Sequence, residues 1–261
     1  MSDSLPVVLC LSGHDPTGGA GLHADIETLS HLGLHACSVV TALTVQDTVN
    51  VRQVLPQTKH AFLLQANTLL RDVRVDAVKI GLLGSADIAS AVVEIVQSLS
   101  GVPVVLDPIL AAGGGKDMTG SGLLDILREE LLPLATVLTP NTPEARRLTD
   151  LLDLDACAEA LLQRGCGAAL ITGTHEDGEH VVNRLYAPEQ SKSWQWARLP
   201  HSYHGSGCTL AAALAGFLAL KMPLEEAAFS AQQFTWQSLQ AGVALGQGQY
   251  VPVRRVGGHR R

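Results

Sequence analysis

The chain has 261 residues, enough for one large α/β domain or two small ones, and its 46% apolar and 16% charged residues are typical of a folded core. A net charge of −7 argues against a nucleic-acid-binding surface. The five scattered cysteines form no C-x-x-C pair, and no signal-peptide pattern is visible. The longest apolar run is too short to span a bilayer. We therefore expect a cytoplasmic protein that binds neither membrane nor nucleic acid.

Short apolar runs alternate with helix-like segments along the first half of the chain. In chain order we predict a strand over residues 7–11, a helix over 20–32, strands over 37–43 and 49–54, a helix over 58–70, a strand over 77–80, a helix over 85–99 and a strand over 102–106. Ser85 suits the N-cap of its helix, and the alternating pattern of residues 49–54 suits an edge strand.

The second half continues this alternation. After a glycine-rich loop at 113–117 we predict a helix over 121–131 capped by Ser121, a strand over 136–138, a helix opening near Pro143, a strand over 168–171, an antiparallel hairpin over 181–186 and 193–199, and helices over 207–220 and 224–241. The order predicts an α/β fold: a single-domain, three-layer sandwich with a mostly parallel sheet and a core over about 7–241. Residues 254–261 read as a flexible basic tail.

The segment from His204 to Thr209 opens the helix predicted over residues 207–220. Gly205 and Gly207 allow the backbone to approach a ligand closely, and the free N–H groups of a helix start attract an anion such as phosphate. The same field predicts a lowered pKa for the Cys208 thiol, which would make it a base or a nucleophile. The alternative is a glycine-rich helix start with a small buried cysteine.

A second glycine-rich segment, residues 12–21, follows the first strand. Its Gly19-x-Gly21-x-x-Ala24 spacing is that of a dinucleotide fingerprint, but Asp15-Pro16 separates it from the strand, so we favour a substrate-side loop. Residues 13–21 and 113–116 are candidates for a mobile lid. Asp25 either faces the site or complements the dipole of its helix.

Acidic and amide side chains occur at two further strand ends. Asn141 and Glu144 share one helix face and either hold Mg²⁺ beside a nucleotide's phosphates or form a capping arrangement. Asp107 ends a strand and is either a turn residue or a carboxylate near phosphate and metal. Together with the glycine-rich anion site, these residues favour phosphoryl transfer.

Six motifs in order carry a specific resemblance: Ser12-Gly-x-Asp-Pro-x-Gly-Gly-Ala-Gly-x-x-Ala-Asp25, Thr41-Ala-Leu-Thr-x-Gln46, Val78-Lys-Ile-Gly-Leu-Leu83, Leu106-Asp-Pro108, Leu138-Thr-Pro-Asn-x-x-Glu-Ala145 and His204-Gly-Ser-Gly-Cys-Thr209. The chain resembles the hydroxymethylpyrimidine/phosphomethylpyrimidine kinases of thiamine biosynthesis, which belong to the ribokinase-like superfamily. The resemblance extends from about residue 7 to residue 241.

The resemblance implies a ribokinase-like fold, a homodimer, and phosphorylation by ATP and Mg²⁺ of 4-amino-5-hydroxymethyl-2-methylpyrimidine, first on its alcohol and then on the resulting phosphate. Gln46 would bind the pyrimidine, since a carboxamide matches an exocyclic amine and the adjacent ring nitrogen. The other implied roles are pocket lining by Gly13, Asp25 and Leu82; an anion hole at Gly205, Ser206, Gly207 and Cys208, with Cys208 as base; ATP binding by Asp107, Asn141, Thr172 and His175; and Mg²⁺ binding by Glu144 and Asp107.

One segment departs from the family pattern. Many members carry Lys-Gly-Gly-His where this chain has Thr172-Gly-Thr-His175, so this chain lacks the family's cation near the ATP phosphates. Lys79 and Lys116 are the candidates to replace that cation. Three alternatives to the pyrimidine kinase stay open: a pyridoxal kinase of the same superfamily, a non-catalytic ligand-binding relative, and a nicotinamide oxidoreductase.

Overall fold

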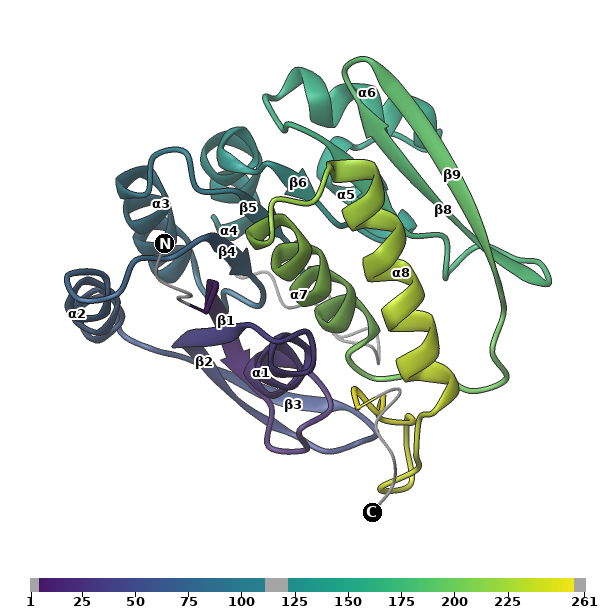
Figure 1. Cartoon of the computed structure of the whole chain (residues 1–261), viewed down its shortest axis with the longest axis horizontal. Coiled ribbons are helices and arrows are strands. Elements are labelled where there is room, and N and C mark those ends of the chain that lie inside the picture. The colour runs from purple at the N-terminus through teal and green to yellow at the C-terminus, as the bar shows by residue number, and fades with distance from the viewer. Residues whose placement is uncertain (1–4, 111–121, 256–261) are drawn as a thin grey trace.

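A computed structural model gives the fold and describes residues 5–110 and 122–255 (Figure 1). Its described residues form a nine-stranded sheet in the order β3-β2-β1-β4-β5-β6-β7-β8-β9. The strands are β1 (Val7–His14), β2 (His35–Gln46), β3 (Val51–Pro56), β4 (Ala77–Ile80), β5 (Val104–Leu106), β6 (Val137–Leu138), β7 (Ala169–Ile171), β8 (His180–Ala187) and β9 (Gln190–Ala197).

The strand pairing confirms a mostly parallel sheet. The strands from β2 through β1, β4, β5 and β6 to β7 pair in parallel, whereas β3 pairs with β2, β8 with β7 and β9 with β8 in antiparallel fashion. The edge position predicted for residues 49–54 is confirmed by β3, and the predicted hairpin by β8 and β9. Because the parallel strands share one direction, their carboxyl ends meet at one edge, where ligands bind in such folds.

Helices cover both faces of the sheet (Figure 1). They are α1 (Gly21–His31), α2 (Lys59–Leu70), α3 (Ala86–Ser98), α4 (Leu123–Ile126), α5 (Thr142–Thr149), α6 (Leu154–Gln163), α7 (Ser206–Ala219) and α8 (Leu224–Gln240). Side chains of α1, α7 and α8 share one buried cluster with the sheet, and those of α2 to α6 share the other. This is the predicted three-layer arrangement.

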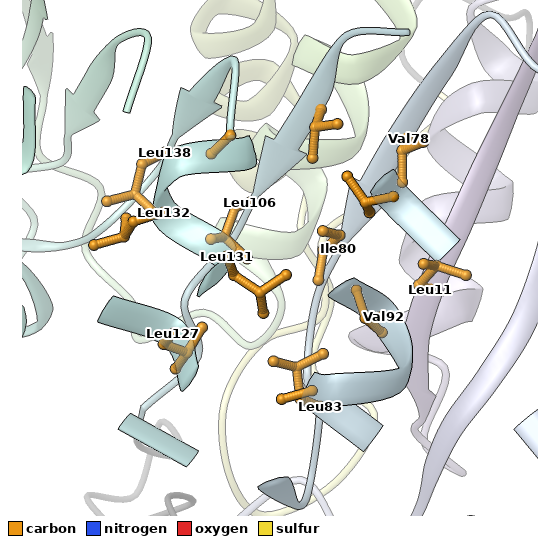
Figure 2. Packing of buried hydrophobic residues seen from close by; sticks show 14 of the residues in the cluster. Leu11, Val78, Ile80, Leu83, Val92, Leu106, Leu127, Leu131, Leu132 and Leu138 are labelled. Carbon is orange, nitrogen blue, oxygen red and sulfur yellow. The ribbon is translucent and has the colours of Figure 1, made fainter. Parts of the chain in front are cut away.

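Strand periodicity divides the core. Alternate side chains of a strand face opposite sides of the sheet, so Val78 and Ile80 of β4 join the cluster beneath α3, which Figure 2 shows with Leu11, Val92 and Leu106. Ala77 faces the other layer, beneath α7. Lys79 shares this face with Ala77 by the same alternation, which places a fully buried lysine under α7.

Several predicted elements need correction. The helix expected over 121–131 begins in the described residues at Leu123, continues as a π-helical turn over Leu127–Leu131 and ends in a 3-10 turn over Leu132–Leu134; Ser121 lies outside the described residues. Helix α6 was not predicted, although Asp153 caps it by accepting the Ala156 N–H at 2.9 Å. The Ser85 cap is confirmed by its bond from the Ile88 N–H at 3.2 Å.

The predicted tail is wrong at its first residue. Arg254 is only 1% exposed, because four hydrogen bonds satisfy its guanidinium inside the protein. Residues 256–261 lie outside the described part of the chain. Among the described helices, none combines the length and the hydropathy that crossing a membrane would require.

Candidate active site

A cavity of about 980 Å³ lies at the carboxyl ends of the parallel strands. All the predicted site residues except Asp25 line it: Gly13, Gln46, Leu82, Asp107, Asn141, Glu144, Thr172, His175, Gly205, Ser206, Gly207 and Cys208. They come from the ends of β1, β2, β4, β5, β6 and β7 and from the start of α7. The topology therefore gathers residues from almost the whole sequence around one space.

The first turn of α7 faces this cavity. Gly205 is the N-cap and has the left-handed φ of 76°, a conformation that favours glycine. The N–H groups of Ser206, Gly207 and Cys208 have no acceptor one turn earlier in the helix, as at every helix start. The predicted anion site is therefore a true helix N-terminus that opens into the cavity.

The Cys208 thiol is not the acidic thiol that we predicted. Burial raises its pKa to about 11, although the charge of Lys79 and a hydrogen bond from the Gly21 N–H lower it. The side chain is 7% exposed, so the loss of solvation outweighs the electrostatic support of its surroundings. At neutral pH the thiol is protonated.

Lys79 and Asp25 form an ion pair beneath the cavity. The Lys79 Nζ lies 2.8 Å from Asp25 Oδ1 and 2.9 Å from Ser12 Oγ, and both charged side chains are fully buried. Burial alone lowers the pKa of Lys79, but the charges of Asp25, Cys208 and Asp107 outweigh it and raise the pKa. Asp25 therefore lies under the predicted pyrimidine pocket rather than in its lining, and Lys79 does not replace the missing family lysine; Lys116 lies outside the described residues.

Asn141 and Glu144 form the capping box of α5. The Asn141 side chain accepts the Glu144 N–H at 2.9 Å, and Glu144 Oε2 accepts the Asn141 N–H at 2.9 Å. The capping alternative is thus confirmed. Glu144 nevertheless lines the cavity, and burial together with the charge of Asp107 raises its pKa to about 8 against the hydrogen bonds from Asn141 and Leu110.

Asp107 lies beside the anion site. A Cβ added to Gly207 would lie 3.5 Å from Asp107 Oδ2, and this buried oxygen has no hydrogen-bond partner among the described residues. Burial raises the pKa of Asp107 to about 6, although Lys79 lowers it. An unpartnered carboxylate oxygen fits a Mg²⁺ ion, which takes one or two carboxylates and completes its shell with water and phosphate oxygens. No cluster of three or more metal-ligating side chains occurs in the described residues, so water and phosphate would supply most of the ligands.

Gln46 presents an oriented carboxamide to the same cavity. Its Nε2 donates to Thr44 Oγ1 at 2.7 Å, and the Thr44 hydroxyl donates to the His14 carbonyl at 2.9 Å. Because the hydroxyl hydrogen is used on His14, Thr44 Oγ1 accepts from Gln46, which fixes which end of the amide is nitrogen. The amide oxygen and the second N–H are available to a ligand.

Comparison with known proteins identifies the family of this chain. The model of the phosphomethylpyrimidine kinase family matches residues 15–254. The chain belongs to this family. The hydroxymethylpyrimidine/phosphomethylpyrimidine kinase of Escherichia coli K12 is 38% identical over 214 residues, covering 79% of this chain and 80% of that protein. Members of the family are kinases, so the protein is a phosphotransferase.

Solved structures of related kinases have the same fold as this chain. The phosphomethylpyrimidine kinase of Clostridium difficile 630 is 31% identical, with a TM-score of 0.78 over 89% of this chain and 98% of that chain. A pyridoxal kinase of Staphylococcus aureus, solved with AMP-PCP and pyridoxal, is 27% identical, with a TM-score of 0.88 over 97% of this chain and 94% of that chain. The expected ribokinase-like α/β fold is confirmed.

The structure of this family member also shows cavity residues that the sequence did not single out. Gln232 of α8 accepts from Asn183 Nδ2 and Trp196 Nε1, each at 3.0 Å, at the end lined by Thr172 and His175. The one signal for Gln232 is a polar residue in a mostly apolar helix face. Thr172 holds the end of β7 by donating its N–H to the Pro140 carbonyl at 2.9 Å.

The loop over residues 13–21, one of the two lid candidates, is held to its neighbours by hydrogen bonds. Asp15 is 2% exposed and accepts hydrogen bonds from the N–H groups of Thr17 and Ala20, each at 2.8 Å. It also pairs with His204, whose Nε2 lies 2.8 Å from Oδ2. These contacts fasten the loop to the segment before α7. The other lid candidate, residues 113–116, lies outside the described residues.

Proposed function

We propose that the protein phosphorylates 4-amino-5-hydroxymethyl-2-methylpyrimidine on its alcohol and then phosphorylates the resulting monophosphate, with ATP as donor, in thiamine biosynthesis. The observation that carries this proposal is that one cavity is lined by the α7 N-terminus, an oriented carboxamide, Gln46, and an unpartnered carboxylate, Asp107. A heteroaromatic alcohol needs a hydrogen-bonding partner such as the carboxamide, and a polyphosphate with its metal ion needs the helix N-terminus and the carboxylate.

Gln46 would select the pyrimidine. Its free amide oxygen accepts a hydrogen bond from an exocyclic amine, and its free N–H donates to the adjacent ring nitrogen. Gly13 and Leu82, on the same side of the cavity, would bound the ring; a Cβ on Gly13 would lie 3.0 Å from Leu82 Cδ2, so a larger residue would close this space.

The start of α7 would hold the phosphoryl group during transfer. The N–H groups of Ser206, Gly207 and Cys208 point at the charge that develops on its oxygens, without reorganisation during the reaction. The substrate oxygen would bond to the γ-phosphorus as the bond from that phosphorus to the β–γ bridging oxygen breaks and ADP leaves. Because the Cys208 thiol is protonated at rest, it would first have to lose its proton to solvent, and the resulting thiolate would then accept the alcohol proton. Asp107 and Glu144 would hold Mg²⁺, which neutralises phosphate charge when it is bound, while Asn141, Thr172 and His175 would contact the nucleotide.

Pyridoxal is the second candidate substrate. The similarity to the Staphylococcus aureus pyridoxal kinase favours it, since pyridoxal is also a hydroxymethyl-bearing nitrogen heteroaromatic. Steady-state ADP release with each alcohol tests the choice. We expect a higher kcat/KM for the hydroxymethylpyrimidine, whereas a higher value for pyridoxal would move the assignment to vitamin B6 salvage.

We further propose that the protein is cytoplasmic and homodimeric. All five cysteines are free, as in proteins of a reducing compartment. Leu43, Val45 and Leu55 are exposed on the β2–β3 edge, a surface that a second copy would cover. Light scattering after gel filtration tests the dimer, and a mass of one chain at micromolar concentration would contradict it.

A further inference from the structure

Arg254 joins the C-terminal segment to the anion site. It is among the largest fully buried side chains of the described residues. Its Nε donates to Thr209 Oγ1 at 2.9 Å, and its Nη2 donates to the Gly19 carbonyl. Its Nη1 reaches the Gly18 carbonyl at 3.4 Å and Glu27 Oε2 at 3.1 Å. One guanidinium thus binds the β1–α1 loop, helix α1 and helix α7.

The two elements that Arg254 joins are already in close contact. A Cβ on Gly205 would overlap the Gly19 carbonyl, so the loop lies directly against the N-cap of α7. The Thr209 hydroxyl, which accepts from Arg254, donates in turn to the Gly205 carbonyl at 2.8 Å. Arg254 is therefore linked through the Thr209 hydroxyl to Gly205, the N-cap residue from which the N–H groups of the anion site follow.

The chain reaches this position along a defined path. After α8, the Val251 N–H donates to the Val243 carbonyl at 2.9 Å, and the Val253 N–H donates to the Ser238 carbonyl at 3.0 Å. The Tyr250 carbonyl accepts the His204 N–H at 2.9 Å. Figure 1 shows this yellow segment returning past the end of α8 on the side of α1. The segment is thus attached to α8 through Val253 and to His204, the residue before Gly205, through Tyr250.

We propose that Arg254 is a positioning residue for phosphoryl transfer, holding the Gly18–Gly19 turn against the first turn of α7 so that the anion site keeps its geometry. The inference rests on the proposed function. The guanidinium does not line the cavity and acts through Thr209 and the backbone. Loss of such support displaces donors that must lie within tenths of an ångström of the transferred group, and a misplacement of about 1 Å lowers a rate by ~10²-fold.

The test compares R254M, R254K and R255M with the parent enzyme. R254M keeps an unbranched stem about as far as the position of Nε and removes all the donors of the guanidinium. R254K restores the charge and one donor group, and R255M changes the exposed neighbour. We expect R254M to lower kcat by ~10- to 100-fold with little change in KM for the pyrimidine alcohol, R254K to recover part of kcat, and R255M to match the parent. A merely stabilising role would lower the melting temperature and leave kcat of the folded enzyme unchanged.

A folded R254M with parental kcat, or an R254K as impaired as R254M, would overturn the proposal. Where R254M does not fold, T209V decides, because it removes only the hydroxyl between Arg254 and Gly205; a severalfold lower kcat supports the proposal, and a parental kcat overturns it. The parent enzyme runs in the same assay. No turnover by the parent counts against the proposed function, whereas an active parent with an equally active R254M counts against this inference alone.

Discussion

The His204 ring and the Asp15 carboxylate, which both line the cavity, form a hydrogen bond with Nε2 2.8 Å from Oδ2, although 189 residues separate them in the chain. The carboxylate can only accept, so His204 Nε2 carries the hydrogen. The bond fixes the β1–α1 loop against the segment that leads into α7. The two glycine-rich segments of the sequence are therefore joined directly by side-chain hydrogen bonding.

Asp15→Asn tests the contribution of this contact to stability. Burial alone raises the pKa of Asp15, but hydrogen bonds from His204 and Thr17 outweigh it and lower the pKa. A lowered carboxyl pKa stabilises the fold above the ordinary range near pH 4, and this stabilisation is lost as the pH falls. We expect the variant to lose ~1–3 kcal/mol in urea unfolding at pH 7 and to approach the parent below pH 4. A constant difference at both pH values would contradict this assignment.

Asp107→Asn tests the opposite case. Burial raises the pKa of Asp107 to about 6, so the folded state holds the proton more tightly than the unfolded state. Stability is then highest below the ordinary carboxyl pKa and falls as the pH rises through about 6. We expect the ligand-free variant to be more stable than the parent at pH 8, with a free energy of unfolding in urea that is roughly 1–3 kcal/mol higher. This difference should vanish toward pH 4.

The exposed Asp177→Asn variant serves as the control for both carboxyl variants and should follow the parent at every pH. Asp107→Asn should also lose most kinase activity, because the carboxylate that destabilises the folded protein at high pH is the one proposed to hold Mg²⁺. A variant that is less stable than the parent at pH 8, or as active, would disprove this role of Asp107.

Gln46→Ala should weaken binding of the pyrimidine. The substitution leaves the amine and ring nitrogen of the ligand without partners, at a cost of ~1–3 kcal/mol, and calorimetry measures it directly. Thr44→Val should weaken binding in the same direction, because it removes the hydroxyl that orients the Gln46 amide. Gln53→Ala on the exposed face of β3 is the matched control. Parental affinity in Gln46→Ala would remove this residue from the site.

Cys208→Ala should affect the two phosphorylation steps unequally. An alcohol must lose its proton as it attacks, whereas a phosphate monoester is already largely ionised at pH 7. A thiol with a pKa of about 11 is protonated at rest, and a loose transition state demands little of a base, so we expect the lower end of the usual range, a loss of ~10²-fold in alcohol phosphorylation. The second step should fall less, and equal losses would point to a purely positional role.

Sequence patterns predicted those features that depend on local order. Apolar alternation predicted the mostly parallel sheet, and the ends of its strands placed Asp107, Asn141 and Gln46 at one cavity. Ser85 was recognisable as a cap because capping depends on its own helix alone.

The failures concern partners that are distant in sequence. Asp25 was expected in the pocket, and its position is set by Lys79, a lysine that strand alternation buries 54 residues later. The Cys208 thiol was expected to be acidic from the helix start alone, but burial by surrounding elements decides its pKa. Arg254 was taken for part of a tail because no pattern in a short basic segment indicates carbonyl acceptors in the β1–α1 loop.

The most direct test of the account is a time course of products by mass spectrometry, with the parent enzyme, Mg²⁺, ATP and the hydroxymethylpyrimidine. We expect the monophosphate to appear first and the diphosphate then to form as the monophosphate is consumed. A pyrimidine that stays unphosphorylated would contradict the proposed function, whether or not pyridoxal is phosphorylated in a parallel reaction.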